Sequence, residues 1–333
     1  MTKKSPITPT IPLDADGVHH GFLKLPYSRD DSAWGAVMIP ITVIRNGNGP
    51  TALLTGGNHG DEYEGPVALF KLANHLAASE IRGRVIILPA MNYPAFCAAT
   101  RISPIDRGNL NRTFPGRPDG TVTEKIADYI LRHLVPLADI VLDIHSGGKT
   151  LDFIPFAAAH VLPDKKQQAA CIAAMKAFGA PWSMMMLELD AVGMFDTVVE
   201  DAGKTFVTTE LGGGGSTTAE RVAIADRGVR NLLIHAGILA GDLDIPEPTR
   251  MLDMPGDDCF IASEVTGLFE PCVDLGAKVR KDDLVARVYD IERTGGKMTE
   301  YFARRDGILA ARHFPGLIKT GDCLAVIAAM VDS

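Results

Sequence analysis

Four short aliphatic runs limit this chain to a narrow set of folds. They are TALLTG (51–56), VIILPA (85–90), IVLDIHS (140–146) and TFVTTEL (205–211). Runs of this length, bounded by glycine or proline, are typical of strands that are buried on both faces of a parallel sheet. Segments with helical apolar spacing lie between them, such as TVTEKIADYILRHL from residue 121. We therefore predict an α/β fold with a mixed, mostly parallel sheet and helices on both faces.

The character of the chain changes near residue 245. Residues 1–50 indicate a β lead-in to the main sheet, and LDIPEPTRMLDMPG (243–256) is a proline-rich joint. Short apolar pairs separated by Gly-Asp or Gly-Ala turns follow it, which indicates a small barrel-like β domain. The sequence predicts a main domain over residues 1–245 and a small β-rich domain over residues 246–333.

Composition excludes several classes of partner. The net charge of -8, without a long basic run, argues against binding to nucleic acid. No run of about 18 apolar residues is present, so we expect no membrane span. The N-terminal lysines lack the apolar stretch of a secretory signal, and the five cysteines are scattered, which is typical of reduced thiols. We expect a cytoplasmic protein, and we expect it to form a homo-oligomer.

A histidine and a carboxylate follow the first aliphatic run. In LLTGGNHGDEYEGP, His59 and Glu62 are three residues apart in a turn. A neutral imidazole and a carboxylate at this spacing can bind one cation, and Zn²⁺ suits this mixture of ligands. The pair alone is also consistent with a solvated turn that holds a hydrogen-bonded histidine.

Two more aliphatic runs end in residues of the same kind. His145 ends IVLDIH and Glu210 ends TFVTTE, each before glycines. Ligands of open α/β sheets bind outside the carboxyl ends of the strands, so we expect these side chains near His59. His145 would complete a metal-ligand set of two histidines and one glutamate, and Glu210 could move a proton. Asp143 points to the same side of its strand as His145, so it either orients that ligand or forms a strand-end hydrogen bond.

An arginine-rich loop follows the second aliphatic run. Arg101, Arg107 and Arg112 lie there in TRISPIDRGNLNRTFPG, together with Asn109 and Asn111. Guanidinium groups bind carboxylates in a bidentate way, although a surface loop can also hold arginines for solubility. The loop leaves the predicted sheet at the edge where the histidines lie. It is therefore a candidate site for a carboxylate-bearing substrate.

Four motifs in this order resemble the succinylglutamate desuccinylase/aspartoacylase family, which is related to the zinc carboxypeptidases. They are His59-x-x-Glu62, NLNRTFPG, DIHSG and TTELGG, and they cover roughly residues 50–240. The resemblance implies one Zn²⁺ per chain, held by His59, Glu62 and His145. It also implies that Glu210 is the general base and acid.

The resemblance assigns the remaining polar residues to the substrate. Arg101 would polarise the scissile carbonyl, with Arg107 as a rival, while Asn111 and Arg112 would hold the α-carboxylate of a small N-acyl amino acid. The layout of the whole chain is most similar to the bacterial branch that deacetylates Nα-acetyl-L-2,4-diaminobutyrate in ectoine breakdown. A free ammonium group on that substrate would need an acidic partner, for which Glu188 and Asp190 are candidates unless both simply face solvent.

The same candidate residues are consistent with three other functions. The same zinc ligands would serve a desuccinylase or aspartoacylase that acts on another N-acyl amino acid. They would also serve a carboxypeptidase-type peptidase, which needs a cleft open to longer chains. A non-catalytic binding protein with the same fold is the third, and the presence of all four candidate residues argues against it.

Overall fold

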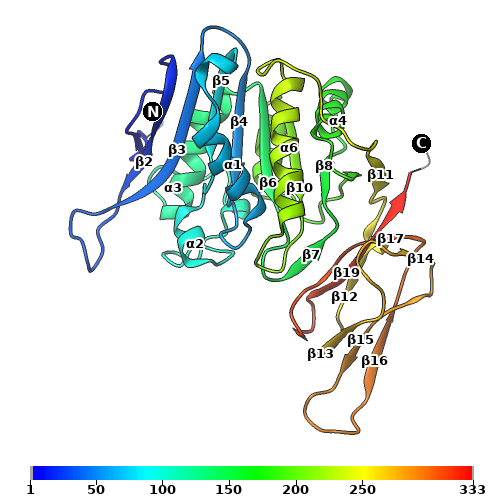
Figure 1. The fold of residues 1–333 in the computed structure, drawn as a ribbon. Coiled ribbons are helices and arrows are strands. Elements are labelled where there is room, and N and C mark those ends of the chain that lie inside the picture. Colours follow the sequence, from blue (N-terminus) through cyan, green and yellow to red (C-terminus); the bar gives the residue numbers. More distant parts are fainter. Residues whose placement is uncertain (1–2, 332–333) are drawn as a thin grey trace.

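The computed structural model describes residues 3–331 and has the predicted α/β class (Figure 1). Its centre consists of the four aliphatic runs, which are parallel strands in the order β5-β4-β6-β10. Their bounds are β4 (Thr51–Gly56), β5 (Gly83–Leu88), β6 (Ile140–His145) and β10 (Thr205–Glu210). Because these strands are parallel, their carboxyl ends meet at one edge, where Glu210 pairs in register with His145.

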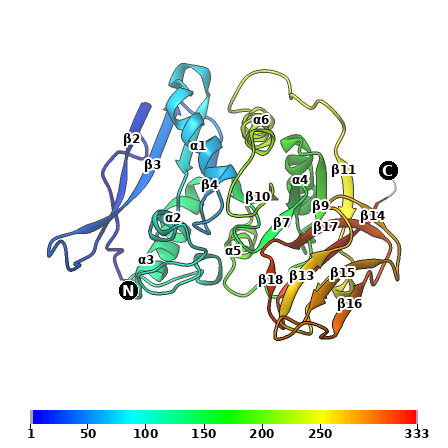
Figure 2. The same cartoon turned by 60° about the horizontal axis from the view of Figure 1, so that its bottom comes forward.

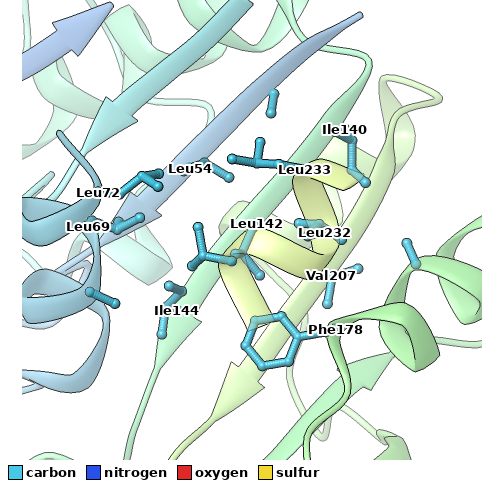
Figure 3. Packing of buried hydrophobic residues seen from close by; sticks show 14 of the residues in the cluster. Leu54, Leu69, Leu72, Ile140, Leu142, Ile144, Phe178, Val207, Leu232 and Leu233 are labelled. Carbon is cyan, nitrogen blue, oxygen red and sulfur yellow. The ribbon is translucent and has the colours of Figure 1, made fainter. Parts of the chain in front are cut away.

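Helices cover both faces of this sheet. Adjacent strand residues alternate between two cores, so that Leu54 and Leu142 belong to one, and Leu53 and Val141 to the other. The first core, shown in Figure 3, contains α1 (Glu64–His75), α4 (Lys165–Phe178) and α6 (Ala219–His235). The second contains α3 (Val122–Tyr129), the π-helical turn Ile130–Leu134 that continues it, and α5 (Phe195–Asp201).

Local sequence signals set the ends of three helices. Thr121 and Glu124 form the capping box of α3, and Gly179 ends α4 in the left-handed conformation. The sequence also suggests a capping box from Thr217 at the start of α6, but the structure places the cap at Thr218, which accepts a hydrogen bond from the Arg221 amide. The Thr217 hydroxyl is buried near Glu64 instead, so it does not reach the helix end.

Antiparallel strands extend the sheet on both sides. The lead-in strands β2 (Gly17–Pro26) and β3 (Ala36–Asn46) form one edge region. On the other side follow β8 (Phe156–Ala159), β9 (Trp182–Met185) and β11 (Arg250–Asp253). Beyond them lie C-terminal strands that complete the large sheet and a separate sheet in the order β16-β15-β13-β18. The remaining elements are β1 (Thr8–Pro9), α2 (Tyr93–Ala98), β7 (Leu151–Phe153), β12 (Phe260–Ala262), β13 (Gly267–Pro271), β14 (Lys278–Val279), β15 (Leu284–Tyr289), β16 (Met298–Phe302), β17 (Gly307–His313), β18 (Leu317–Ile318), β19 (Cys323–Met330) and short 3₁₀ turns.

The C-terminal strands are joined to the main sheet. Strand β19 pairs with β11, and β17 pairs with β7. Figures 1 and 2 both show the C-terminal strands β14 to β17 on the side of β7 and β11, away from β2 and β3. A third core contains Phe156 and Met184 together with Met254 and Ala310, and thus joins residues on both sides of position 245. The division of the chain at that position stays a prediction.

The structure also bears on the membrane span and the state of the cysteines, which composition addressed. None of the helices described over residues 3–331 is long and apolar enough to span a bilayer. All five cysteines are free thiols in the structure.

Candidate metal centre and active site

The turn after β4 carries the first two candidate ligands. Gly57 adopts a φ of +63°, and a Cβ on Gly60 would lie 2.0 Å from the carbonyl carbon of Ala95, so the turn packs directly against α2. The Gly60 amide also donates to the carbonyl of Thr100. These contacts hold His59 and Glu62 in a buried position at the carboxyl edge of the sheet.

Three predicted ligands meet there. The Glu62 carboxylate lies between two imidazoles, with Oε1 2.7 Å from His59 Nδ1 and Oε2 3.0 Å from His145 Nδ1. Each residue offers a ligand atom within 4.8 Å of the others. Segments more than 80 residues apart in the chain thus form one buried cluster, which we call the His59–Glu62–His145 cluster.

Asp143 fixes the orientation of His145. Its Oδ2 lies 2.7 Å from His145 Nε2 and accepts a hydrogen bond from Asn58, while Oδ1 accepts one from the Thr55 hydroxyl. An ionised carboxylate can only accept, so we assign the Nε2 proton of His145 to this bond. The Nδ1 lone pair is then directed at Glu62. Two acceptors that face each other in this way require a cation between them, either a proton or a metal ion.

The charges in the cluster support this. Burial alone would raise the pKa of Glu62, but His59 and His145 outweigh it and hold that pKa well below the usual range. Burial would lower the pKa of His145, yet Asp143 and Glu62 raise it well above its ordinary value. Two imidazoles and one carboxylate are the usual donor set of a catalytic zinc site. The residues therefore fit a metal ion.

Glu210 lies at the end of β10, beside His145. Its Oε2 is buried, and no donor among the described residues reaches it. Burial raises the pKa of Glu210 well above its ordinary value, and the charge of Glu62 raises it further. A carboxyl group in this state is suited to take up and release a proton.

A cavity of about 610 Å³ opens over the cluster and Glu210. Arg101, Asn111 and Arg112 line it, and Arg101 Nη1 lies 3.6 Å from Glu62 Oε1. Arg107 is exposed and is not among the lining residues. Between the two arginines that the sequence left open for the carbonyl, the structure thus places Arg101 at the cavity. Asn111 Oδ1 accepts a hydrogen bond from the Phe195 amide, which leaves its amide nitrogen free to donate.

Several residues of the site escaped the sequence analysis. Asn58 and Thr55 support Asp143, and only their place beside the His59 turn hinted at a role. Asp196 lines the cavity near Glu188, but nothing in the sequence around Asp196 marked it as a site residue. C-terminal residues also reach the cavity, which a single sequence does not reveal: Met254, Phe260, Ala310, His313, Asp322, Cys323 and Val326.

Comparisons with known proteins agree with this geometry. The family described as Succinylglutamate desuccinylase/Aspartoacylase catalytic domain matches residues 48–236. The N-alpha-acetyl-L-2,4-diaminobutyric acid deacetylase of Halomonas elongata is 59% identical over 332 residues, which are 99% of this chain and 97% of that protein.

Solved structures give the same result. The product-bound structure of the ectoine utilization protein EutE (DoeB) from Ruegeria pomeroyi has a TM-score of 0.96 and 67% identity, and the match covers 98% of this chain and 100% of that one. A succinylglutamate desuccinylase/aspartoacylase from Rhodobacter sphaeroides has a TM-score of 0.94 and 39% identity over 98% of this chain and 100% of that one. This chain belongs to the succinylglutamate desuccinylase/aspartoacylase family.

Proposed function

We propose that this protein is a zinc-dependent amide hydrolase that removes acetate from Nα-acetyl-L-2,4-diaminobutyrate in ectoine breakdown. The observation that carries the proposal is the 59% identity to the Halomonas elongata deacetylase over nearly the full length of both chains. The buried His59–Glu62–His145 cluster below a cavity of about 610 Å³ supports it, because that volume suits a small molecule.

In this proposal His59, Glu62 and His145 hold one Zn²⁺ per chain. The ion, when bound, would act as a Lewis acid that lowers the pKa of water from its bulk value toward about 7. Asp143 keeps the Nδ1 atom of His145 directed at Glu62, since it accepts the proton of Nε2.

Glu210 carries the proton in both steps. Its buried carboxylate takes a proton from the attacking water molecule as the water oxygen bonds to the amide carbon. When the C–N bond breaks, the same carboxyl group delivers that proton to the leaving amine. Burial and the neighbouring charge of Glu62 raise the pKa of Glu210, which makes its carboxylate a stronger base.

Three residues position the substrate. The Arg101 guanidinium donates to the amide oxygen as negative charge develops on it. Asn111 and Arg112 bind the α-carboxylate of the amino acid. Arg101 is preferred to Arg107 for the carbonyl because it lines the cavity beside Glu62.

The test is acetate release by the zinc-loaded protein and by its Glu210→Gln variant. We expect turnover of Nα-acetyl-L-2,4-diaminobutyrate in preference to N-acetylaspartate and N-succinylglutamate, with a loss of about 10²- to 10⁴-fold in kcat for the variant and an unchanged zinc content. Glu220→Gln, on the exposed first turn of α6, is the matched control and should keep full activity. Preferential turnover of another substrate would replace the proposed one, and no turnover of any would reject an acyl amino acid hydrolase.

A further inference from the structure

A second cluster of a histidine and carboxylates lies beside the cavity. Glu188 follows β9, and Asp196 lies in the first turn of α5. Both side chains line the same cavity as Arg101 and Glu210. Asp196 is only 6% exposed, so its carboxylate is largely removed from bulk water. We call Glu188 and Asp196 the acidic wall.

His160, which is buried, and Glu200, which is half-buried, lie behind the acidic wall. His160 Nδ1 lies 2.9 Å from Glu200 Oε1, and His160 Nε2 lies 3.8 Å from Glu188 Oε1. That second distance is too long for a hydrogen bond, and both Nε2 and Glu188 Oε1 are buried without a partner among the described residues. Asp196 Oδ1 accepts from the amide and the hydroxyl of Thr197, whereas no such bond reaches Oδ2 over residues 3–331. Asp196 Oδ2 is thus a free acceptor atom on a side chain that lines the cavity.

The acidic wall and Glu200 together carry negative charge that the protein neutralises only in part. Three carboxylates surround one imidazole, and within residues 3–331 no lysine or arginine forms an ion pair with any of them. Although burial opposes it, Glu188 and Glu200 raise the pKa of His160 to about 10, so one positive charge is present. Burial raises the pKa of Asp196, the charge of His160 opposes this, and the charge of Glu188 adds to it. A cation from the cavity would relieve this excess of negative charge.

The acidic wall is adjacent to the residues that would hold the substrate carboxylate. The amide of Phe195, the neighbour of Asp196, donates to the Asn111 side chain. The carbonyl of Gly193 accepts a hydrogen bond from the amide of Phe114, and Phe114 lies two residues after Arg112 in the chain. One face of the cavity therefore combines groups suited to a carboxylate with groups suited to a cation. An amino acid with a short cationic side chain carries both charges only three carbon–carbon bonds apart or fewer.

We propose that Glu188 and Asp196 bind the side-chain ammonium group of the substrate and select a diamino acid over neutral and acidic amino acids. This inference rests on the proposed function, because it names the group that makes the hydrolase specific. His160 is a positioning residue in it, since Glu200 holds the ring and the ring faces Glu188. Acidic side chains, such as that of N-acetylaspartate, would meet the same wall and be repelled.

A metal ion is the competing occupant. His160, Glu188 and Asp196 offer ligand atoms within 4.8 Å of one another. This set contains only one imidazole nitrogen and no thiolate, however, whereas catalytic zinc sites combine two or three histidines, or thiolates, with at most one carboxylate. An ammonium group needs only carboxylate oxygens, which the wall provides at the cavity.

The experiment compares two substrates of equal shape. Nα-acetyl-L-norvaline carries a methyl group where Nα-acetyl-L-2,4-diaminobutyrate carries its ammonium group. We expect the wild-type protein to prefer the charged substrate, and Asp196→Asn and Glu188→Gln each to lower the ratio of the two kcat/KM values by about 10- to 100-fold. The change should come from KM of the charged substrate, while turnover of the norvaline substrate, which also reports correct folding, stays within a few-fold. Asp201→Asn, exposed on the same helix, is the matched control.

The outcomes separate this inference from the proposed function. Equal turnover of both substrates by the wild type, or an unchanged ratio in both variants, would overturn the role of the acidic wall and leave the hydrolase in place. A second metal ion per chain that is lost in Glu188→Gln would also overturn it. If the wild type hydrolyses neither substrate, the proposed function fails. Calorimetric binding of L-2,4-diaminobutyrate against L-norvaline then decides the acidic wall alone, with Asp196→Asn expected to lose the difference.

Discussion

The two histidine–carboxylate clusters contain the same residue types and have different chemistry. In the first, His59 and His145 direct their Nδ1 atoms at a single carboxylate, that of Glu62. In the second, one imidazole lies among the carboxylates of Glu188, Asp196 and Glu200. Two imidazoles that share one carboxylate can surround a metal ion. One imidazole among three carboxylates offers a metal ion a single nitrogen donor, and the excess of negative charge suits an ammonium group.

Proximity of potential ligand atoms does not by itself define a metal site. Both clusters place three potential ligand atoms within 4.8 Å of one another. What differs is the number of imidazole rings that face the shared carboxylate, and what orients them. In the first cluster Asp143, itself held by Thr55 and Asn58, fixes one ring with Nδ1 toward Glu62.

The largest effect would come from removing a ligand in only one cluster. We expect Glu62→Gln to lose bound zinc and roughly a thousandfold or more of kcat, because the neutral amide replaces the one charged ligand. His160→Gln should keep one zinc per chain. Metal content by mass spectrometry after dialysis, measured beside activity, checks both variants. An equal loss of zinc in the two variants would break the distinction between the clusters.

The second effect concerns stability and its dependence on pH. The pKa of His160 is raised to about 10 in the folded protein, against about 6.5 in an unfolded chain. Because the folded pKa is the higher one, the contribution to stability is complete below pH 6.5 and is lost as the pH rises toward 10. We expect His160→Gln to lower the free energy of unfolding by roughly 3 kcal/mol at pH 6.5.

Urea unfolding at pH 6.5 and at pH 9.5 checks this expectation. The difference in the free energy of unfolding between wild type and variant should be smaller at the higher pH, because the unfolded chain has by then released the histidine proton that the folded protein still largely holds. His75→Gln, on the exposed end of α1, should show no such gap at either pH. A gap that is constant or grows with pH would mean that His160 is neutral, and the acidic wall would then resemble a metal site.

The two clusters also differ in how far the sequence predicts them. The first was accessible because each ligand lies at the end of an aliphatic run or in the turn after it, and parallel strands bring their carboxyl ends together. His59, Glu62, His145 and Glu210 meet where this rule places them. The same rule identified the α/β fold and its four central strands.

The acidic wall follows from no such rule. Asp196 and Glu200 lie on α5, a helix of seven residues, and Glu188 lies in an irregular segment after β9. Their meeting with His160 depends on how this segment packs against β8, which no local pattern encodes. The contribution of β17 and β19 to the cavity is inaccessible for the same reason, since it rests on pairings between distant strands.

The third effect concerns Asp143, which orients His145. Asp143→Asn keeps an oxygen near the ring but removes the charge that holds the Nε2 proton. We expect zinc affinity to fall about 10- to 100-fold, with activity restored by excess zinc. Competition with a chelator measures the affinity. Asp139→Asn, near the other end of the same strand, likewise removes the charge from an acceptor, here of the Thr51 amide, and should leave zinc affinity unchanged. A similar loss in both variants would point to general destabilisation of β6.

We expect the smallest effect at Thr55, which contacts Asp143. Its hydroxyl donates to Asp143 Oδ1 over 2.7 Å, and Thr55→Val removes this bond while keeping the shape of the side chain. We expect zinc affinity to fall less than tenfold, since one hydrogen bond to a charged acceptor is lost and Asn58 still holds the other oxygen. The same chelator competition measures it, and the variant combined with Asp143→Asn should add little to the loss from Asp143→Asn alone. Full additivity of the two losses would show that Thr55 does not act through Asp143, and that the first cluster is organised from its ligands alone.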